Sequence, residues 1–173
     1  MDWIQTWTGK AFRPLDPEPG SIDVRDIAHA LSLLCRFNGH CHEFYSVAEH
    51  SVRISRAVPP QHALWGLLHD AAEAYISDLP RPIKRQMPDF VAFEDRLLER
   101  IMACYGLPWP MPDEVKRADD VLLATEQRDL MAAPPEPWGL PAEPLPEPIV
   151  PMSAPAAEAA FLARFHELWP TSR

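Results

Sequence analysis

Apolar residues recur at helical spacing through most of the chain, and proline, glycine and asparagine separate one apolar segment from the next. The first predicted helix begins with Asp23 as its N-cap and ends before Asn38. The second begins at Ser46, where Ser-Val-Ala-Glu is a capping-box pattern, and it ends at Pro59. These signals predict two helices, one that begins at Asp23 and one that begins at Ser46.

Four further helices are predicted downstream. The third runs from Leu64 through Tyr75 until the sequence SDLPRP stops it. The fourth covers roughly residues 88–105, and the fifth runs from the residue after Pro112 to about Ala132. A proline-rich stretch then precedes a last helix near the end of the chain.

Strand-like alternation of any length is missing from the sequence, so the predicted fold is all-α, a compact helical bundle with an extended proline-rich segment. We expect one domain over residues 1–173. Its parts are an N-terminal arm or short hairpin (1–22), a helical core (23–132), a proline-rich belt (133–152) and a C-terminal helix (153–170).

Composition narrows the class of protein. The 173 residues are 47% hydrophobic and 24% charged, which is typical of a globular domain. A formal net charge of −9 argues against nonspecific nucleic-acid binding and against an anionic membrane surface. The start, MDWIQTWTGK, lacks the pattern of a signal peptide. The cysteines Cys35, Cys41 and Cys104 form no CxxC pair, and we expect reduced thiols in a cytoplasmic protein.

A candidate metal site emerges from the predicted hairpin at Pro59. Two antiparallel helices joined there place His50 opposite roughly residues 67–69, where His69 and Asp70 stand side by side in an apolar run. Asp119, on the apolar face of the fifth helix, is the candidate fourth ligand, whereas its neighbour Asp120 points away from that face.

This donor set indicates the kind of metal. Two neutral imidazoles and two carboxylates neutralise one divalent cation and leave positions for water and substrate. Imidazole favours manganese, cobalt, zinc, iron or nickel over magnesium. Isolated histidines on helices are usually structural, and this interpretation is assigned to His29, His62 and His166.

The order His50, His69-Asp70, Asp119 resembles the H…HD…D signature of HD-domain metal-dependent phosphohydrolases. The segments YSVAEHS, HDAAEAYISDLPRPIK and VKRADDVLLATE resemble stretches of bacterial HD-type 5′-deoxynucleotidases. CRFNGHCHEFYSVAEHS is similar to a branch with prophage-type deoxynucleotidases and phage HD-type dATP triphosphohydrolases. The resemblance covers roughly residues 3–130 and implies a compact HD-domain bundle with one divalent metal.

The resemblance also implies roles for residues outside the ligand set. Glu73, one turn after Asp70, would activate or orient the attacking water. Asp78 would contact the sugar or order the site, and Arg36 would bind phosphate. Three further residues would border the substrate: Lys84, His40 and His42. Glu126 and Asp129 are expected to be mainly structural, with support of a metal ligand as the alternative.

We therefore expect an enzyme that hydrolyses phosphate esters or anhydrides of nucleotides, foremost 2′-deoxynucleotides, as a 5′-deoxynucleotidase or a dNTP triphosphohydrolase. The expected partner is a small-molecule nucleotide, and the resemblance implies a homo-oligomer, dimeric or larger. Two alternatives stay open: a hydrolase of a signalling nucleotide, and a non-catalytic nucleotide-binding or metal-binding HD protein. A plain helical interaction module would leave the His-Asp pair unexplained.

Overall fold

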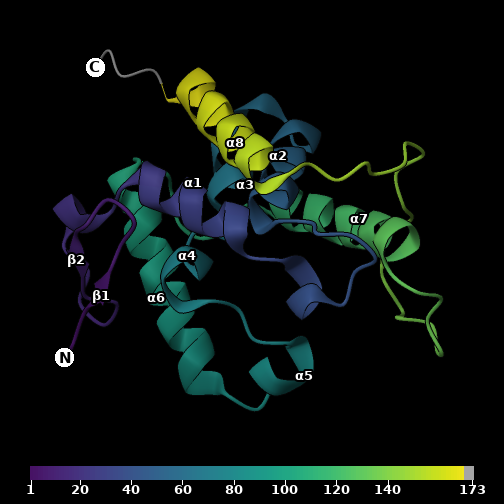
Figure 1. Ribbon diagram of the computed structural model, residues 1–173, viewed down its shortest axis with the longest axis horizontal. Coiled ribbons are helices and arrows are strands. Elements are labelled where there is room, and N and C mark those ends of the chain that lie inside the picture. The colour runs from purple at the N-terminus through teal and green to yellow at the C-terminus, as the bar shows by residue number, and fades with distance from the viewer. Residues whose placement is uncertain (170–173) are drawn as a thin grey trace.

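The computed structural model describes residues 1–169, and within them the all-α prediction is confirmed (Figure 1). One small antiparallel hairpin, β1 (Ile4–Gln5) and β2 (Ala11–Phe12), precedes the helices. The helices are α1 (Val24–Leu33), α2 (Val47–Ala57), α3 (Ala63–Leu68), α4 (Glu73–Ile76), α5 (Arg81–Lys84), α6 (Pro88–Cys104), α7 (Asp113–Leu130) and α8 (Ala154–Leu168). Short 3-10 turns are η1 (Pro19–Ser21), η2 (Arg36–Gly39) and η3 (Pro60–His62). Within residues 1–169, no helix combines the length and apolarity needed to cross a membrane.

Local capping signals fix where the helices begin. The Asp23 side chain accepts a hydrogen bond from the Arg25 backbone N–H at the start of α1. Ser46 does the same for the Glu49 N–H at the start of α2. The reciprocal half of the predicted capping box does not form, because the Glu49 carboxylate instead binds Arg53 and the backbone N–H of Met152.

The predicted third helix is wrong in one respect. The chain forms α3 and α4 with a turn over residues 69–72 between them. The His69 ring donates its Nδ1–H to the Gly66 carbonyl, the acceptor that an uninterrupted helix would offer to the Asp70 N–H. Within the turn, hydrogen bonds join residues three apart, as in a 3-10 helix; the Ala71 N–H donates to the Leu68 carbonyl at 2.9 Å.

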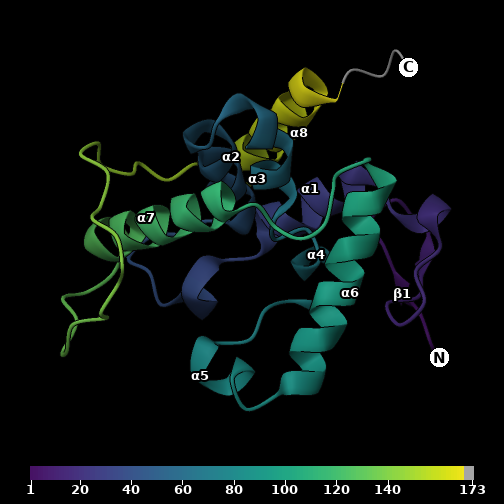
Figure 2. The same ribbon diagram turned by 180° about the vertical axis from the view of Figure 1, so that it is seen from behind.

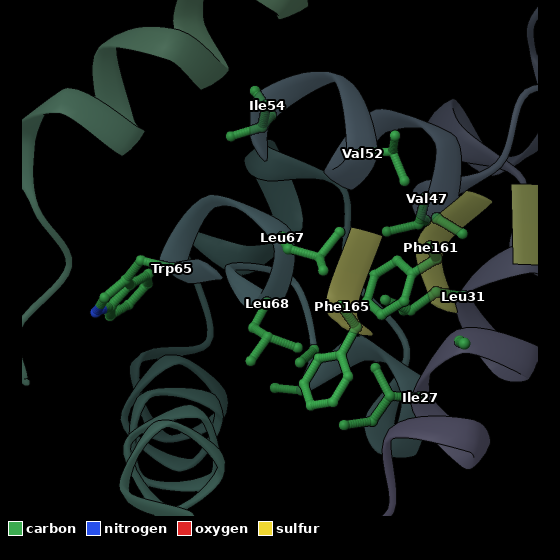
Figure 3. Close-up of a cluster of buried hydrophobic side chains, with 14 of the residues drawn as sticks. Ile27, Leu31, Val47, Val52, Ile54, Trp65, Leu67, Leu68, Phe161 and Phe165 are labelled. Carbon is green, nitrogen blue, oxygen red and sulfur yellow. The ribbon is translucent and has the colours of Figure 1, made fainter. Parts of the chain in front are cut away.

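The hydrophobic core lies where α8 packs on α1, α2 and α3 (Figures 1 and 3). Phe161 and Phe165 of α8 insert between the buried faces of these helices, opposite Ile27 of α1 and Leu68 of α3. The C-terminal helix therefore completes the core, although it follows the proline-rich belt and is far from α1 in the sequence.

The N-terminal hairpin and the belt are both tied to the bundle. The backbone N–H and hydroxyl of Thr8 donate to the buried carboxylate of Asp26, at 2.7 and 2.8 Å. Figure 2 shows the belt looping around the C-terminal end of α7 and returning toward α8. Asp129 accepts a hydrogen bond from the Ile149 N–H, and Thr125 accepts one from the Leu145 N–H. The Asp129 contact fits the structural role predicted for it.

Helices α2 and α3 approach closely at Gly66. A Cβ atom at this position would lie 3.1 Å from the Ile54 side chain and 3.3 Å from the Ser55 backbone. Because Ser55 is on α2, only the missing side chain of Gly66 allows the two helices to reach this spacing. The same spacing determines how close His50 and His69 can come.

We expect Gly66→Ala to lower the free energy of unfolding by about 1 kcal/mol, since overpacking against backbone outweighs the better helix propensity of alanine. For a chain of this length the melting temperature should fall by roughly 2–4 °C. Gly20→Ala is the matched control, because nothing lies within 4 Å of the added Cβ. Equal melting temperatures for the two variants would contradict the close approach of α2 and α3.

Candidate metal centre

Two buried imidazoles face each other between α2 and α3. The Nε2 atoms of His50 and His69 are 3.2 Å apart, and both side chains are almost fully buried. The predicted pairing across the hairpin is therefore confirmed. Neither ring can reach bulk water to satisfy its nitrogens, so the partners of all four ring nitrogens decide what the pair can bind.

The outer ring nitrogens are already committed as donors. His50 donates its Nδ1–H to the Glu126 carboxylate (2.6 Å), and His69 donates its Nδ1–H to the Gly66 carbonyl (2.9 Å). In neutral imidazoles this leaves a lone pair on each Nε2 atom. Two lone pairs directed at one another at 3.2 Å repel unless a positive charge lies between them.

Carboxylates surround the same point. Asp119 of α7 brings Oδ1 to 3.3 Å from the His50 Nε2, and Asp70 brings Oδ2 to 3.1 Å from the His69 Nε2. His50, His69 and Asp119 offer ligand atoms that all lie within 4.8 Å of one another, so this group could hold a metal ion. The Asp70 Oδ2 is also 3.7 Å from the His50 Nε2.

The electrostatics of the cluster favour positive charge at its centre. Burial and Arg36 would lower the pKa of His50, but Glu126 and Asp119 raise it to about 9. Burial would raise the pKa of Asp119, but His50 and His69 lower it to about 2. Burial would also raise the pKa of Asp70, but the neighbouring His69 outweighs burial and lowers it. A proton on His50 is therefore one way to supply the charge, and a metal cation is the other.

An outer layer holds the His50 ring in position. Glu126, fully buried on α7, accepts from His50 through Oε1 and from the Nε–H and NH2 groups of Arg36 through Oε2 (3.0 and 2.8 Å). Burial opposes ionisation of Glu126, but Arg36 and His50 lower its pKa. Such carboxylate–histidine pairs fix the orientation of a ligating imidazole.

This contact of Glu126 with His50 corresponds to the alternative left open by the sequence, support of a candidate metal ligand. Its spacing from Asp119 is the signal that was available, since residues seven apart lie on the same face two turns later. Arg36, predicted to bind phosphate, is held by Glu126 and places its NH1 atom 3.7 Å from the Asp70 carboxylate. Its guanidinium therefore lies at the edge of the cluster.

Glu73 lies at the start of α4, one turn beyond Asp70. Burial, together with the charges of Asp70 and Asp78, raises its pKa well above the ordinary value. Within residues 1–169, its carboxyl group makes no hydrogen bond. The structure thus brings Glu73 near Asp70 without assigning it a partner.

Asp78 and Lys84 form an ion pair away from the imidazoles. The Lys84 ammonium lies 2.9 Å from Asp78 and 2.6 Å from Glu94 of α6, a partner that the sequence did not reveal. Figure 1 shows α5, which ends at Lys84, beside the start of α6 and apart from α2 and α3. Lys84 therefore already has two carboxylates around its charge.

The remaining predicted residues vary in placement. His40 and His42 are exposed on the loop before α2, where the His42 backbone N–H donates to the Leu130 carbonyl. Their substrate role stays a prediction. His29 stacks on Trp7 and contacts Glu158, as expected for a structural histidine.

The fold and site together define an all-α protein with a buried histidine–carboxylate candidate metal centre. No family model matches the chain. The uncharacterized protein YfdR of Escherichia coli is 41% identical over 172 residues, which cover 97% of this chain and 96% of YfdR. The uncharacterized protein RCAP_rcc00048 of Rhodobacter capsulatus is 36% identical over 126 residues, covering 67% of this chain and 64% of that protein. The chain therefore belongs to the family of YfdR.

Substituting Asp119 tests the centre directly. We expect Asp119→Asn to weaken Mn²⁺ binding by at least about tenfold, because one carboxylate charge beside His50 is lost. Asp120→Asn, at the next position on α7, is the control and should bind Mn²⁺ like the unsubstituted protein. Isothermal titration calorimetry on chelator-treated protein measures both affinities. Equal weakening in the two variants would contradict a specific site at Asp119.

Proposed function

We propose that the protein is a metal-dependent phosphohydrolase that acts on nucleotides, foremost 2′-deoxynucleotides. The observation that carries this proposal is the convergence of two imidazoles and two carboxylates beside the guanidinium of Arg36. The resemblance of these positions to the HD-domain signature supports the same class of enzyme. The proposed ligand set is His50, His69, Asp70 and Asp119.

The donor set fits one divalent transition metal. Two imidazole nitrogens and two carboxylate oxygens suit manganese, cobalt, zinc, iron or nickel better than magnesium. Such an ion, when bound, would polarise a phosphoryl oxygen and make a bound water more acidic. Glu126 and the Gly66 carbonyl would keep the two imidazoles in the tautomer that offers Nε2.

Glu73 is the proposed proton acceptor for the attacking water. Burial and the charge of Asp70 raise its pKa, and the second cause weakens once a cation neutralises Asp70. A carboxyl group with a raised pKa holds a proton more readily, and this suits a general base. Its position one turn beyond Asp70 brings it to the same side of the cluster.

Arg36 is the proposed ligand of the phosphoryl group. Glu126 fixes two of its donor groups, while NH1 remains directed toward Asp70 and the cluster. A guanidinium held in this way can offset negative charge that develops on phosphoryl oxygens without reorganising.

Aromatic side chains beside Arg36 favour a nucleotide over a simple phosphate ester. The Arg36 guanidinium carbon lies 5.3 Å from the centre of the Phe37 ring, and Trp138 of the belt lies 6.0 Å beyond that ring. Flat bases stack readily on such side chains.

The available cations favour a monophosphate as substrate. A triphosphate needs positive charge beyond the first phosphate, and Lys10, Arg81 and Lys84 are the cations considered for it. Lys84 is paired with Asp78 and Glu94, and Lys10 is paired with Asp23 at 3.1 Å. Because two of these three cations are already paired with carboxylates, we rank the 5′-deoxynucleotidase form above the triphosphohydrolase form.

A product-resolved screen tests the proposal. Deoxynucleoside and ribonucleoside mono-, di- and triphosphates are incubated with Mn²⁺, Co²⁺, Zn²⁺ or Mg²⁺, and phosphate, pyrophosphate and triphosphate are quantified separately. We expect phosphate release from deoxynucleoside monophosphates, loss of activity with a chelator, and recovery with Mn²⁺. Triphosphate release would favour the other enzyme form, and binding without turnover would favour a sensor.

Glu73→Gln separates catalysis from metal binding. We expect kcat to fall by about 100-fold or more, since a general base typically contributes this much, while Mn²⁺ affinity stays close to that of the unsubstituted protein. Glu99→Gln, at an exposed position of α6, is the control and should leave kcat unchanged. A Glu73→Gln enzyme with unaltered kcat would remove Glu73 from the mechanism.

A further inference from the structure

Two cysteines lie in contact beside the candidate metal centre. The Sγ atoms of Cys35 and Cys41 are 3.7 Å apart, and both residues are half-buried. A disulfide needs about 2.05 Å between its sulfur atoms, so a small movement of the intervening loop would join them. The remaining cysteine, Cys104, lies at the end of α6.

The backbone between the two cysteines already brings them together. Phe37, Asn38 and Gly39 have φ angles of 54°, 51° and 80°, three successive residues in the left-handed region. The Cys41 thiol also contacts the Arg36 carbonyl at 3.5 Å. Closing a short loop costs conformational entropy, and the fold has already met this cost in the dithiol form.

We propose that Cys35 and Cys41 form a reversible disulfide when the protein meets a hydroperoxide, and that this bond regulates the metal centre. The Cys35 thiolate attacks the peroxide, its sulfur is oxidised to a sulfenic acid, and the alcohol of the hydroperoxide leaves (water, when the oxidant is hydrogen peroxide). The second thiol attacks that sulfur, the S–S bond forms, and a water molecule leaves. A small dithiol or thioredoxin-type reductant returns both thiols.

The dithiol is the resting form. Burial and the neighbouring Cys35 raise the pKa of Cys41 to about 11, so Cys41 carries its proton at neutral pH. The small thiolate population of Cys41 makes it the second thiol to react, and the contact of the two sulfurs favours an intramolecular bond once Cys35 is oxidised.

Arg36 connects the pair to the metal centre. It directly follows Cys35, and its side chain bonds Glu126 while its NH1 atom faces Asp70. Glu126 in turn holds the His50 ring. Drawing the sulfurs together moves the Arg36 backbone, and the Arg36–Glu126–His50 chain transmits that movement to a metal ligand.

Peptide mapping of the folded, full-length protein tests the bond. Trypsin cleaves after Arg36, so Cys35 falls in residues 26–36 and Cys41 in residues 37–53. After treatment with hydrogen peroxide we expect an intact-mass loss of about 2 Da and a cross-link between these two peptides, both reversed by dithiothreitol. Cys104→Ser should behave identically, whereas Cys35→Ser and Cys41→Ser should lose the cross-link.

Mn²⁺ affinity tests the regulation, and it does so without reference to turnover. Manganese is chosen because thiols compete poorly for it. We expect the oxidised protein to bind Mn²⁺ on the order of tenfold more weakly than the reduced protein, and Cys41→Ser to be insensitive to peroxide. The effect on nucleotide hydrolysis rests on the proposed function and is measured last.

The outcomes separate the two proposals. Intermolecular disulfides, or added oxygen in place of lost hydrogen, would overturn the bond. A Cys35–Cys41 cross-link with unchanged Mn²⁺ affinity would overturn the regulation. A cross-link with weakened Mn²⁺ binding in a protein that hydrolyses no nucleotide would support this inference and contradict the proposed function.

Discussion

The Nε2 atoms of two buried imidazoles face each other across 3.2 Å between α2 and α3, and the surrounding structure favours a positive charge between them, carried either by a proton on His50 or by a cation. Gly66 allows the helices to come close enough, and its carbonyl fixes the His69 ring. Glu126 fixes the His50 ring from α7. Removing either acceptor would free a ring to turn its lone pair away, so the contact depends on residues from three helices.

The proline-rich belt holds α7, which bears Glu126 and Asp119, against the rest of the bundle. Proline-rich backbone forms no ladder of its own, so its free N–H and carbonyl groups need partners elsewhere. Side chains supply them: Asp129 and Thr125 of α7 accept from belt N–H groups, while Glu49 of α2 accepts from Met152. The belt therefore ties α7 to α2, and these helices bear Asp119, Glu126 and His50.

Local sequence signals were sufficient for most helices and for the paired imidazoles. Capping by Asp23 and Ser46 is decided within a few residues, and hairpin length alone placed His50 opposite His69. A break inside the third predicted helix was not predictable in this way. Helical periodicity in LWGLLHDAAEAY continues without a break, whereas competition for the Gly66 carbonyl interrupts the helix at residues 69–72.

The partners in ion pairs were the second feature that the sequence could not predict. Glu126 contacts a histidine 76 positions away in the sequence, and Lys84 has a carboxylate from another helix as its nearest partner. A sequence indicates which residues can form ion pairs, but the pairing depends on how helices are packed. For this reason the sequence offered Lys84 as a free cation and did not identify His50 as the partner of Glu126.

The charges of the cluster account for the valence of the proposed ion. Three carboxylates (Asp70, Asp119 and Glu126) keep lowered pKa values and are ionised, whereas Arg36 contributes one positive charge. Burial and the charge of Asp70 raise the pKa of Glu73, which disfavours its charged form, and its charge is left out of this count. Two negative charges therefore surround two imidazoles, and one divalent cation balances them. Under the proposed function, a site balanced in this way would take up a phosphate without the repulsion expected from the overall negative charge of −9.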